Sequence, residues 1–303
     1  MKLWETYHTP RSVDELLALL RQHAGEARII AGGTDLLVDI RAAHMPPQKA
    51  LIDITAVHEL CEIVDEGDSV LIGAGVTHNQ IVRSQLLASR ATCLVESCGV
   101  VGGPQVRNVA TLGGNVAHAL PAGDGTTSLV ALNAEAEIVK DGQRQWRPIA
   151  ELYLGPGKSL LDSTRDVLLR FRVPLHTADS ATAFSRIMRP QGVALPILGC
   201  AVWVELDADR TIMQASRVCL APVAPTPIRA EAVEAALNGQ PAHETSIERA
   251  IVAARDSLKP RTSKYRATAD YRQEMIEVLL RRTLNRAIER VRTGVSVPEG
   301  VGV

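Results

Sequence analysis

Hydrophobic positions recur along this chain with two periods, one typical of amphipathic helices and one typical of short strands. Ser12 followed by Glu15 has the pattern of a capping box, and the leucines after it form an apolar stripe as far as His23, so we predict a helix there. Across the first 176 residues we also predict helices at 35–42, from 77 onward, at 86–97 and around 129–131, and strands at 28–31, 50–54, 69–73, 135–140, 144–147 and 167–173.

The rest of the chain shows strand patterns first and helical patterns afterwards. We predict strands at 182–188, 198–206 and 215–220, then helices at 230–237, 246–257 and 270–292. Residues 175–182 are polar and without periodicity, which indicates a domain boundary. We therefore expect a first domain of residues 1–176, a second of residues 177–292, and a flexible tail of residues 293–303.

The composition is that of a globular protein with room for two domains. The chain has 303 residues, of which 46% are hydrophobic and 22% charged, and its formal net charge is −1. That balance argues against binding to nucleic acid or to a membrane surface. No apolar run approaches the ~20 residues of a membrane span, and the first residues lack the pattern of a signal peptide, so we expect a cytoplasmic protein.

Five cysteines are scattered along the chain without a CxxC pair or a cluster with histidine. An odd number at irregular spacing favours reduced, mostly buried thiols over disulfides or a zinc site. The same spacing makes an iron–sulfur cluster held by this chain alone a poor hypothesis.

Two glycine-rich segments about eighty residues apart carry the strongest chemical signal. The first reads IIAGGTDLL at 29–37, and the second reads RNVATLGGN at 107–115, followed by PAGD ending at Asp124. Glycines let backbone N–H groups approach a ligand closely, which suits a pyrophosphate. Two such loops in one chain indicate an extended dinucleotide, and FAD is the first hypothesis.

Two other nucleotide motifs fit less well. Gly73-Ala74-Gly75 follows a predicted strand, but the third glycine of a Rossmann fingerprint is replaced by His78. The segment GPGKS at 155–159 resembles the end of a Walker A loop, yet Leu152 stands where its first glycine belongs. We interpret the second segment as a tight turn with a surface lysine.

His118 and Asp124, next to the second glycine loop, each have two interpretations. His118 either hydrogen-bonds to the loop backbone or contacts the flavin. Asp124 either caps the following helix or accepts hydrogen bonds from ribityl or ribose hydroxyls, and its place beside the glycines favours a ligand contact.

The segments AGGTDL at 31–36 and QVRNVATLGGN at 105–115 resemble the two flavin loops in the FAD-binding (medium) subunit of the molybdenum hydroxylases, the family of xanthine dehydrogenase and carbon monoxide dehydrogenase. Further matches follow in order at Asp124, at 155–159, at 166–168 and at Tyr271, so the resemblance covers nearly the whole chain. It implies an α+β fold. An FAD-binding domain of the PCMH or vanillyl-alcohol-oxidase-like type, with two α/β subdomains, would precede a C-terminal three-stranded antiparallel sheet with helices.

The resemblance also implies which residues bind FAD, and it assigns no catalytic residue and no metal ligand to this chain. The residues are Ile29, Ile30, Ala31, Gly32, Gly33, Thr34, Asp35 and Leu36 at the pyrophosphate, Thr111, Gly113, Gly114, Asn115 and Asp124 at the phosphates and ribityl chain, and Val101, His118, Leu168, Ser185 and Arg186 around the flavin ring. Three positions depart from the family. His118 replaces a small residue or threonine, Ser185 replaces a lysine, and Lys264 replaces an aspartate.

By the same resemblance, the chain is one subunit of an oxidoreductase complex. A large subunit would bind molybdopterin, and a small subunit would hold [2Fe–2S] clusters whose electrons reach NAD⁺, O₂ or another acceptor through FAD. Such heterotrimers would be able to pair as dimers. Two alternatives remain open from the sequence: a stand-alone flavin oxidase, for which His118 is the one acid–base candidate, and a flavin-free scaffold that only assembles partners.

Overall fold

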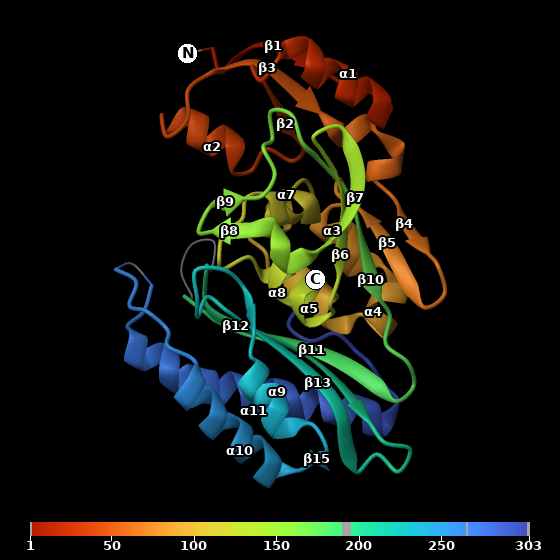
Figure 1. Ribbon diagram of the computed structural model, residues 1–303, viewed down its shortest axis with the longest axis vertical. Coiled ribbons are helices and arrows are strands. Elements are labelled where there is room, and N and C mark those ends of the chain that lie inside the picture. Colours follow the sequence, from red (N-terminus) through yellow and green to blue (C-terminus); the bar gives the residue numbers. More distant parts are fainter. Residues whose placement is uncertain (1, 190–194, 265, 302–303) are drawn as a thin grey trace.

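The computed structural model describes residues 2–189, 195–264 and 266–301. Three regions follow one another along the long axis of the molecule, each built on its own sheet (Figure 1). The chain begins in the region drawn at the top of the view, and its described end returns to the middle region, where Val301 lies against Gly99 of α5. This arrangement of two sheet-and-helix regions above a C-terminal sheet agrees with the predicted α+β architecture.

The first region is a small parallel sheet in the order β1-β3-β2, flanked by two helices. Its elements are β1 (Trp4–His8), α1 (Val13–His23), β2 (Ala27–Ile30), α2 (Leu36–Arg41) and β3 (Gln48–Asp53). The Ser12 hydroxyl accepts a hydrogen bond from the N–H of Glu15, as predicted. The other half of the predicted capping box is wrong, because the Glu15 carboxylate accepts from the N–H of Arg11 at 2.8 Å instead of from that of Ser12.

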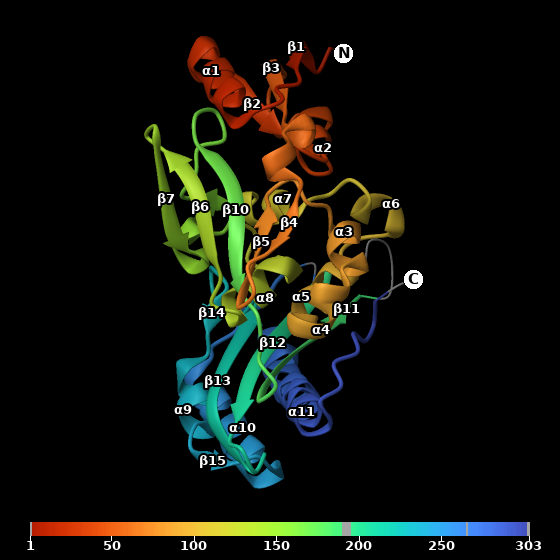
Figure 2. The same ribbon diagram turned by 90° about the vertical axis from the view of Figure 1, so that its right-hand side faces the viewer.

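The middle region is a five-stranded sheet in the order β4-β5-β10-β6-β7, with helices packed against it (Figure 2). Its strands are β4 (Ile63–Asp65), β5 (Ser69–Gly73), β6 (Glu135–Lys140), β7 (Gln143–Pro148) and β10 (Val167–Pro174). Its helices are α3 (His78–Arg83), α4 (Gln85–Arg90), α5 (Thr92–Gly99), α6 (Pro104–Arg107), α7 (Leu112–Ala117) and α8 (Asp124–Ala131). Short 3₁₀ helices span Ile54–Ala56, His58–Leu60 and Ile149–Leu152.

The single helix predicted at 86–97 is wrong, because Ala91, with φ −147° and ψ 45°, separates α4 from α5. The tight turn predicted at 155–159 is confirmed. It joins β8 (Tyr153–Gly155) to β9 (Lys158–Ser159) and leaves Lys158 exposed.

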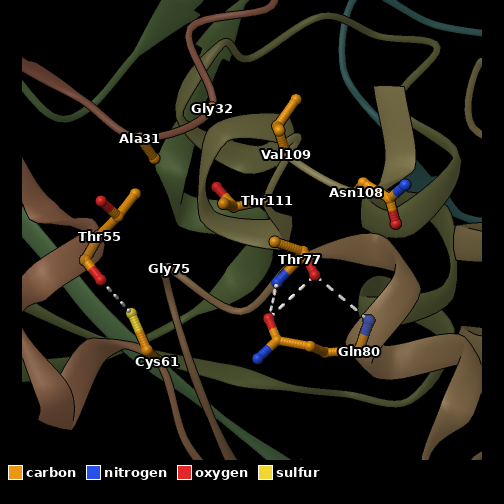
Figure 3. Close-up of a pocket in the computed structure, with 10 residues that line it drawn as sticks. All are labelled: Ala31, Gly32, Thr55, Cys61, Gly75, Thr77, Gln80, Asn108, Val109 and Thr111. Carbon is orange, nitrogen blue, oxygen red and sulfur yellow. Dashed lines mark hydrogen bonds between the residues drawn. The ribbon is translucent and has the colours of Figure 1, made fainter. Parts of the chain in front are cut away.

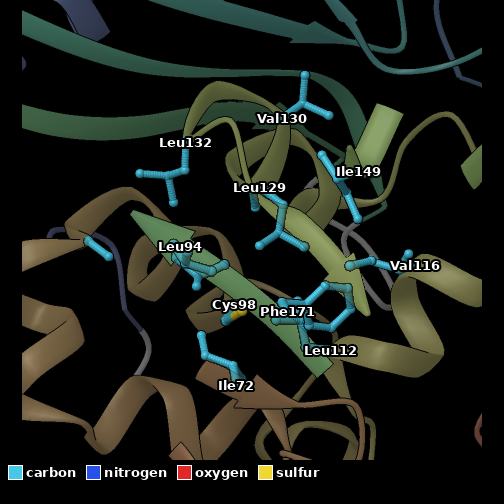
Figure 4. Close-up of a cluster of buried hydrophobic side chains, with 14 of the residues drawn as sticks. Ile72, Leu94, Cys98, Leu112, Val116, Leu129, Val130, Leu132, Ile149 and Phe171 are labelled. Atoms are coloured by element: carbon cyan, nitrogen blue, oxygen red, sulfur yellow. The ribbon is translucent and has the colours of Figure 1, made fainter. Parts of the chain in front are cut away.

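An aliphatic core fills the space between this sheet and its helices. Phe171 of β10 is fully buried and lies among Ile72, Leu94, Leu112 and Leu129, which come from β5, α5, α7 and α8 (Figure 4). Burial of these side chains is the main force that holds α7 and α8 in place. Because α7 begins at the second glycine loop, the core fixes that loop as well.

The C-terminal region contains three long antiparallel strands, as predicted, and two short strands that extend the sheet beside the third. The strands are β11 (Ser180–Met188), β12 (Pro196–Leu206), β13 (Ile212–Ala221), β14 (Ile228–Arg229) and β15 (Gln240–Pro241). The helices are α9 (Glu231–Leu237), α10 (Glu244–Ser257) and α11 (Ala269–Thr293). Helix α11 packs on β11 and β12, while α5 and α8 reach the same sheet from the middle region. The sheet therefore belongs to the cores of both regions.

A buried carboxylate joins the two halves of the chain. Glu96 of α5 is 1% exposed, and its oxygens accept hydrogen bonds from the Phe184 N–H at 2.7 Å, from Arg290 Nη2 at 2.6 Å and from the Glu299 N–H at 2.9 Å. Arg290 also donates to the carbonyl of Val297. These contacts hold Val297 and Glu299, which belong to the segment 293–303 predicted to be a flexible tail. Residues 302 and 303 of that segment lie outside the described residues.

The thiols agree with the sequence interpretation. All five cysteines are free; four are buried and Cys61 is half-buried. In the described ranges, no helix combines the length and apolar character that crossing a membrane requires. The same residues offer no cluster of three or more metal-ligating side chains.

Candidate functional site

The two glycine loops meet at a cleft of about 370 Å³ between the first and middle regions (Figure 3). Its lining comes from four separate segments of the chain. The residues are Ala31, Gly32, Thr55, Cys61, Gly75, Thr77, Gln80, Asn108, Val109 and Thr111. Of the residues assigned to FAD from the sequence, Ala31, Gly32 and Thr111 line this cleft.

Gly32 makes the meeting of the loops possible. A Cβ atom on Gly32 would lie 2.0 Å from the carbonyl oxygen of Val109 and 2.5 Å from its carbonyl carbon. No side chain fits in that space, so the backbones of the two loops pack directly on each other. The neighbouring Gly33 has φ +65°, a conformation that glycine adopts without strain. Gly32 thus allows the two loops to approach closely, and Gly33 allows the chain to turn.

The first loop, of which Ala31 and Gly32 line the cleft, has backbone donors without a partner in the protein. Within the described part of the chain, the N–H groups of residues 32–35 donate to no protein acceptor, and Asp35 makes no side-chain cap at the start of α2. Successive free N–H groups at a loop of this kind form a concave site for an anion. This arrangement fits the pyrophosphate of FAD.

Thr111 and Gly113 fix the second loop. The Thr111 hydroxyl accepts a hydrogen bond from the Gly114 N–H at 3.0 Å and caps α7. A Cβ on Gly113 would lie 2.4 Å from the carbonyl oxygen of Ala74, so α7 sits against the segment after β5. Gly114 is exposed, and a Cβ there would meet only the Thr111 hydroxyl, at 3.2 Å. Gly114 therefore leaves space for a ligand, whereas Gly113 makes room for the chain itself.

Sequence reasoning missed a third segment of the cleft, residues 73–80. Gly75, Thr77 and Gln80 line the cleft, and Thr77 pairs with Thr111 in an isolated β-bridge. Thr77 and Gln80 form a complete capping box at the start of α3, visible as dashed lines in Figure 3. The sequence signal for this segment was Gly73-Ala74-Gly75 after a strand. These glycines do not form a Rossmann fingerprint, but they allow the backbone there to lie close to the carbonyl of Leu60.

Asp124, at the start of α8, and Arg186, in β11, form a buried ion pair. Arg186 Nη1 lies 2.6 Å from Asp124 Oδ2, and both side chains are less than a tenth exposed. Arg186 also donates to the carbonyl of Val100. The alternative that Asp124 caps α8 is wrong, because Gly123 is the N-cap residue and no side chain caps this helix.

The pair has a measurable consequence for the apoprotein. Burial raises the pKa of Asp124 to about 6, against the opposing effect of Arg186. A carboxyl whose pKa is higher in the folded state stabilises the fold at acid pH, and this contribution is lost as the pH rises through about 6. We expect the Asp124→Asn variant to lack that loss. The difference in free energy of unfolding between variant and wild type should change by about 1 kcal/mol per pH unit between pH 4 and 6 in urea titrations. A difference that is constant over this range would contradict the assignment.

The remaining residues assigned to the flavin ring lie outside the lining of the cleft. Leu168 is buried on β10, and Val101 and His118 are half-buried. The Ser185 hydroxyl is buried, with no hydrogen-bond partner among the described residues. The His118 side chain likewise makes no hydrogen bond within the described ranges, so its interpretation as a residue bonded to the loop backbone is not supported.

Comparison with protein families identifies the kind of domain that contains this cleft. Residues 3–176 match the model of the FAD binding domain in molybdopterin dehydrogenase, and residues 182–287 match that of the CO dehydrogenase flavoprotein C-terminal domain. The chain is a member of the molybdenum hydroxylase FAD-subunit family. The predicted family, the FAD cofactor and the oxidoreductase class are confirmed.

Individual relatives agree over almost the full length of this FAD subunit. The carbon monoxide dehydrogenase medium chain of Hydrogenophaga pseudoflava is 32% identical over 94% of this chain and 97% of its own. A solved structure of the enzyme from that organism aligns with a TM-score of 0.88, covering 96% of this chain and 99% of the other. A putative xanthine dehydrogenase FAD-binding subunit of Escherichia coli K12 is 27% identical over 93% of this chain and 96% of its own.

Proposed function

We propose that this subunit passes electrons from the [2Fe–2S] clusters of a small partner subunit, by way of FAD, to NAD⁺, O₂ or another acceptor. In this proposal the hydroxylation takes place on a large partner subunit that binds molybdopterin, in a heterotrimer that can pair as a dimer. The names of the relatives support it, since they include carbon monoxide and xanthine dehydrogenases. So does the lack of a cluster of metal ligands among the residues described here.

The observation that carries the proposal is the cleft between the two glycine loops. When bound there, FAD supplies the redox chemistry, and the protein supplies position and charge. The N–H groups of residues 32–35 bind the pyrophosphate, and Thr111 holds the second loop in the conformation that exposes Gly114. The pair of Asp124 and Arg186 fixes β11 against α8, where the resemblance places the flavin ring.

Flavin reduction in the isolated subunit tests this function. The protein reconstituted with FAD should absorb near ~450 nm and bleach with dithionite. Anaerobic NADH should bleach it at a comparable rate if the acceptor in the complex is NAD⁺, since the electron exchange is reversible. An oxygen- or carrier-linked subunit should bleach with dithionite alone.

Two results would contradict the proposal. A protein that stays colourless after reconstitution would be a scaffold, and one that alone turns over small alcohols or amines would be a self-sufficient oxidase. Restoration of electron flow from a molybdenum subunit and an iron–sulfur subunit to the acceptor, only when this chain is added, would support the proposal directly.

A further inference from the structure

A second cavity, of about 380 Å³, lies where the chain passes from the middle region to the C-terminal region. One wall is formed by the segment that links β10 to β11, and a second by the end of α4. The end of α11 and the turn between β12 and β13 form the remaining walls. The lining residues are Ser89, Arg90, His176, Thr177, Ala178, Ser180, Arg210, Arg290, Gly294 and Ser296. None of them lines the FAD cleft.

The lining is cationic. Among the described residues, it holds three arginines and four hydroxyl side chains and no aspartate or glutamate. The charge of Arg290 is neutralised by Glu96, whose Oε1 lies 2.6 Å from Arg290 Nη2. Arg90, in contrast, donates to the carbonyls of Gly67 and His176, and Arg210 donates to the carbonyl of Arg292. A guanidinium has five N–H donors, so both keep donors as well as a charge that these carbonyls do not neutralise.

A histidine also lines this cavity. His176 Nδ1 lies 3.1 Å from the carbonyl oxygen of Thr177, whereas Nε2 is buried without a hydrogen-bond partner among the described residues. Burial lowers the pKa of His176, so its ring is neutral near pH 7.

We propose that this cavity binds a small organic oxyanion, a phosphate ester or a carboxylate, through the guanidinium groups of Arg90 and Arg210. Guanidinium groups pair with phosphate and carboxylate oxygens in bidentate geometry. The cavity exceeds the ~30 Å³ that one water occupies in the liquid about tenfold, so it has room for a carbon skeleton besides the charged group. Because its walls come from both halves of the chain, the ligand would stabilise their arrangement. The inference is independent of the proposed electron transfer.

Thermal unfolding of the full chain with sulfate, glycerol 3-phosphate and citrate tests the site. Sodium chloride keeps the ionic strength constant, so electrostatic screening is held equal. We expect at least one of these anions to raise the Tm in a saturable manner. Arg90→Gln and Arg210→Gln should each raise the anion concentration at half-saturation about tenfold, the usual effect of losing a charge-assisted hydrogen bond. Comparison of glycerol 3-phosphate with citrate tells a phosphate site from a carboxylate site.

Arg282→Gln is the matched control, since it removes an equal charge from an exposed position of α11. It should leave half-saturation unchanged. Arg210→Gln keeps the test decisive if Arg90→Gln fails to fold, because Arg210 lies in a turn and has fewer structural contacts. The proposal is overturned if none of the three anions gives a saturable shift. It is also overturned if the Arg210→Gln variant responds as the wild type does.

Discussion

Gly32→Ala is expected to weaken the binding of FAD severely. The added methyl group would lie 2.0 Å from the carbonyl oxygen of Val109, well inside van der Waals contact, so the two loops must separate. Their separation displaces the N–H groups of residues 32–35 from the second loop. We expect FAD to bind about 100-fold more weakly or worse, equivalent to at least ~2.7 kcal/mol, when titrated by the quenching of flavin fluorescence.

Gly103→Ala is the matched control for this variant. It adds the same methyl group close to the second loop, but the nearest atom is the flexible side-chain oxygen of Gln105 at 3.1 Å, and φ at Gly103 is −94°. Its affinity for FAD should stay within a few-fold of the wild type. If Gly32→Ala also bound FAD as tightly as the wild type, the direct packing of the two loops would not be what forms the site.

Glu96→Ala should produce the largest loss of stability among single substitutions in the ion pairs. The substitution leaves Arg290, which is 5% exposed, as a buried charge without its carboxylate, and it leaves the N–H of Phe184 without an acceptor. Breaking a buried pair in this way costs about 3–5 kcal/mol. Urea unfolding of the apoprotein would measure the change in free energy.

Two further variants separate the effect of burial on stability from the effect of charge. Glu151→Ala removes an exposed pair with Arg147, in which both side chains are about half exposed, and should cost less than ~1 kcal/mol. The double variant Glu96→Ala/Arg290→Met should recover part of the loss, because it removes the stranded charge. A cost for Glu96→Ala as small as that for Glu151→Ala would show that water reaches this part of the interior.

Periodicity predicted most helices and long strands, because their apolar faces are read directly from the sequence. It failed where a contact distant in the chain decides the local structure. Ala91 interrupts the predicted helix at 86–97, although alanine is the best helix former. Strand β1 was missed because Trp4–His8 shows no alternation and is largely exposed. It is held by its parallel pairing with β3, about forty residues later.

The candidate site, too, could be predicted from the sequence only in part. The glycine loops could be found because close backbone approach demands a particular residue type, and Gly32 shows the reason. The pairing of Asp124 with Arg186 joins residues 62 positions apart, and nothing in the sequence specifies which arginine meets which carboxylate. The role of residues 73–80 was missed because their glycine pattern was compared only with a Rossmann fingerprint.

The carboxylate of Glu96 also bears on how the chain reaches its final state during synthesis. Domains near the N-terminus fold first as a polypeptide emerges, yet the partners of Glu96 are residues 184, 290 and 299. Helix α5 therefore cannot acquire its final surroundings until α11 has been made, however complete the FAD cleft is by then. The segment matched by the first family model, 3–176, thus depends for its final structure on residues 184, 290 and 299. This segment, expressed alone, would expose α5 and be prone to aggregation.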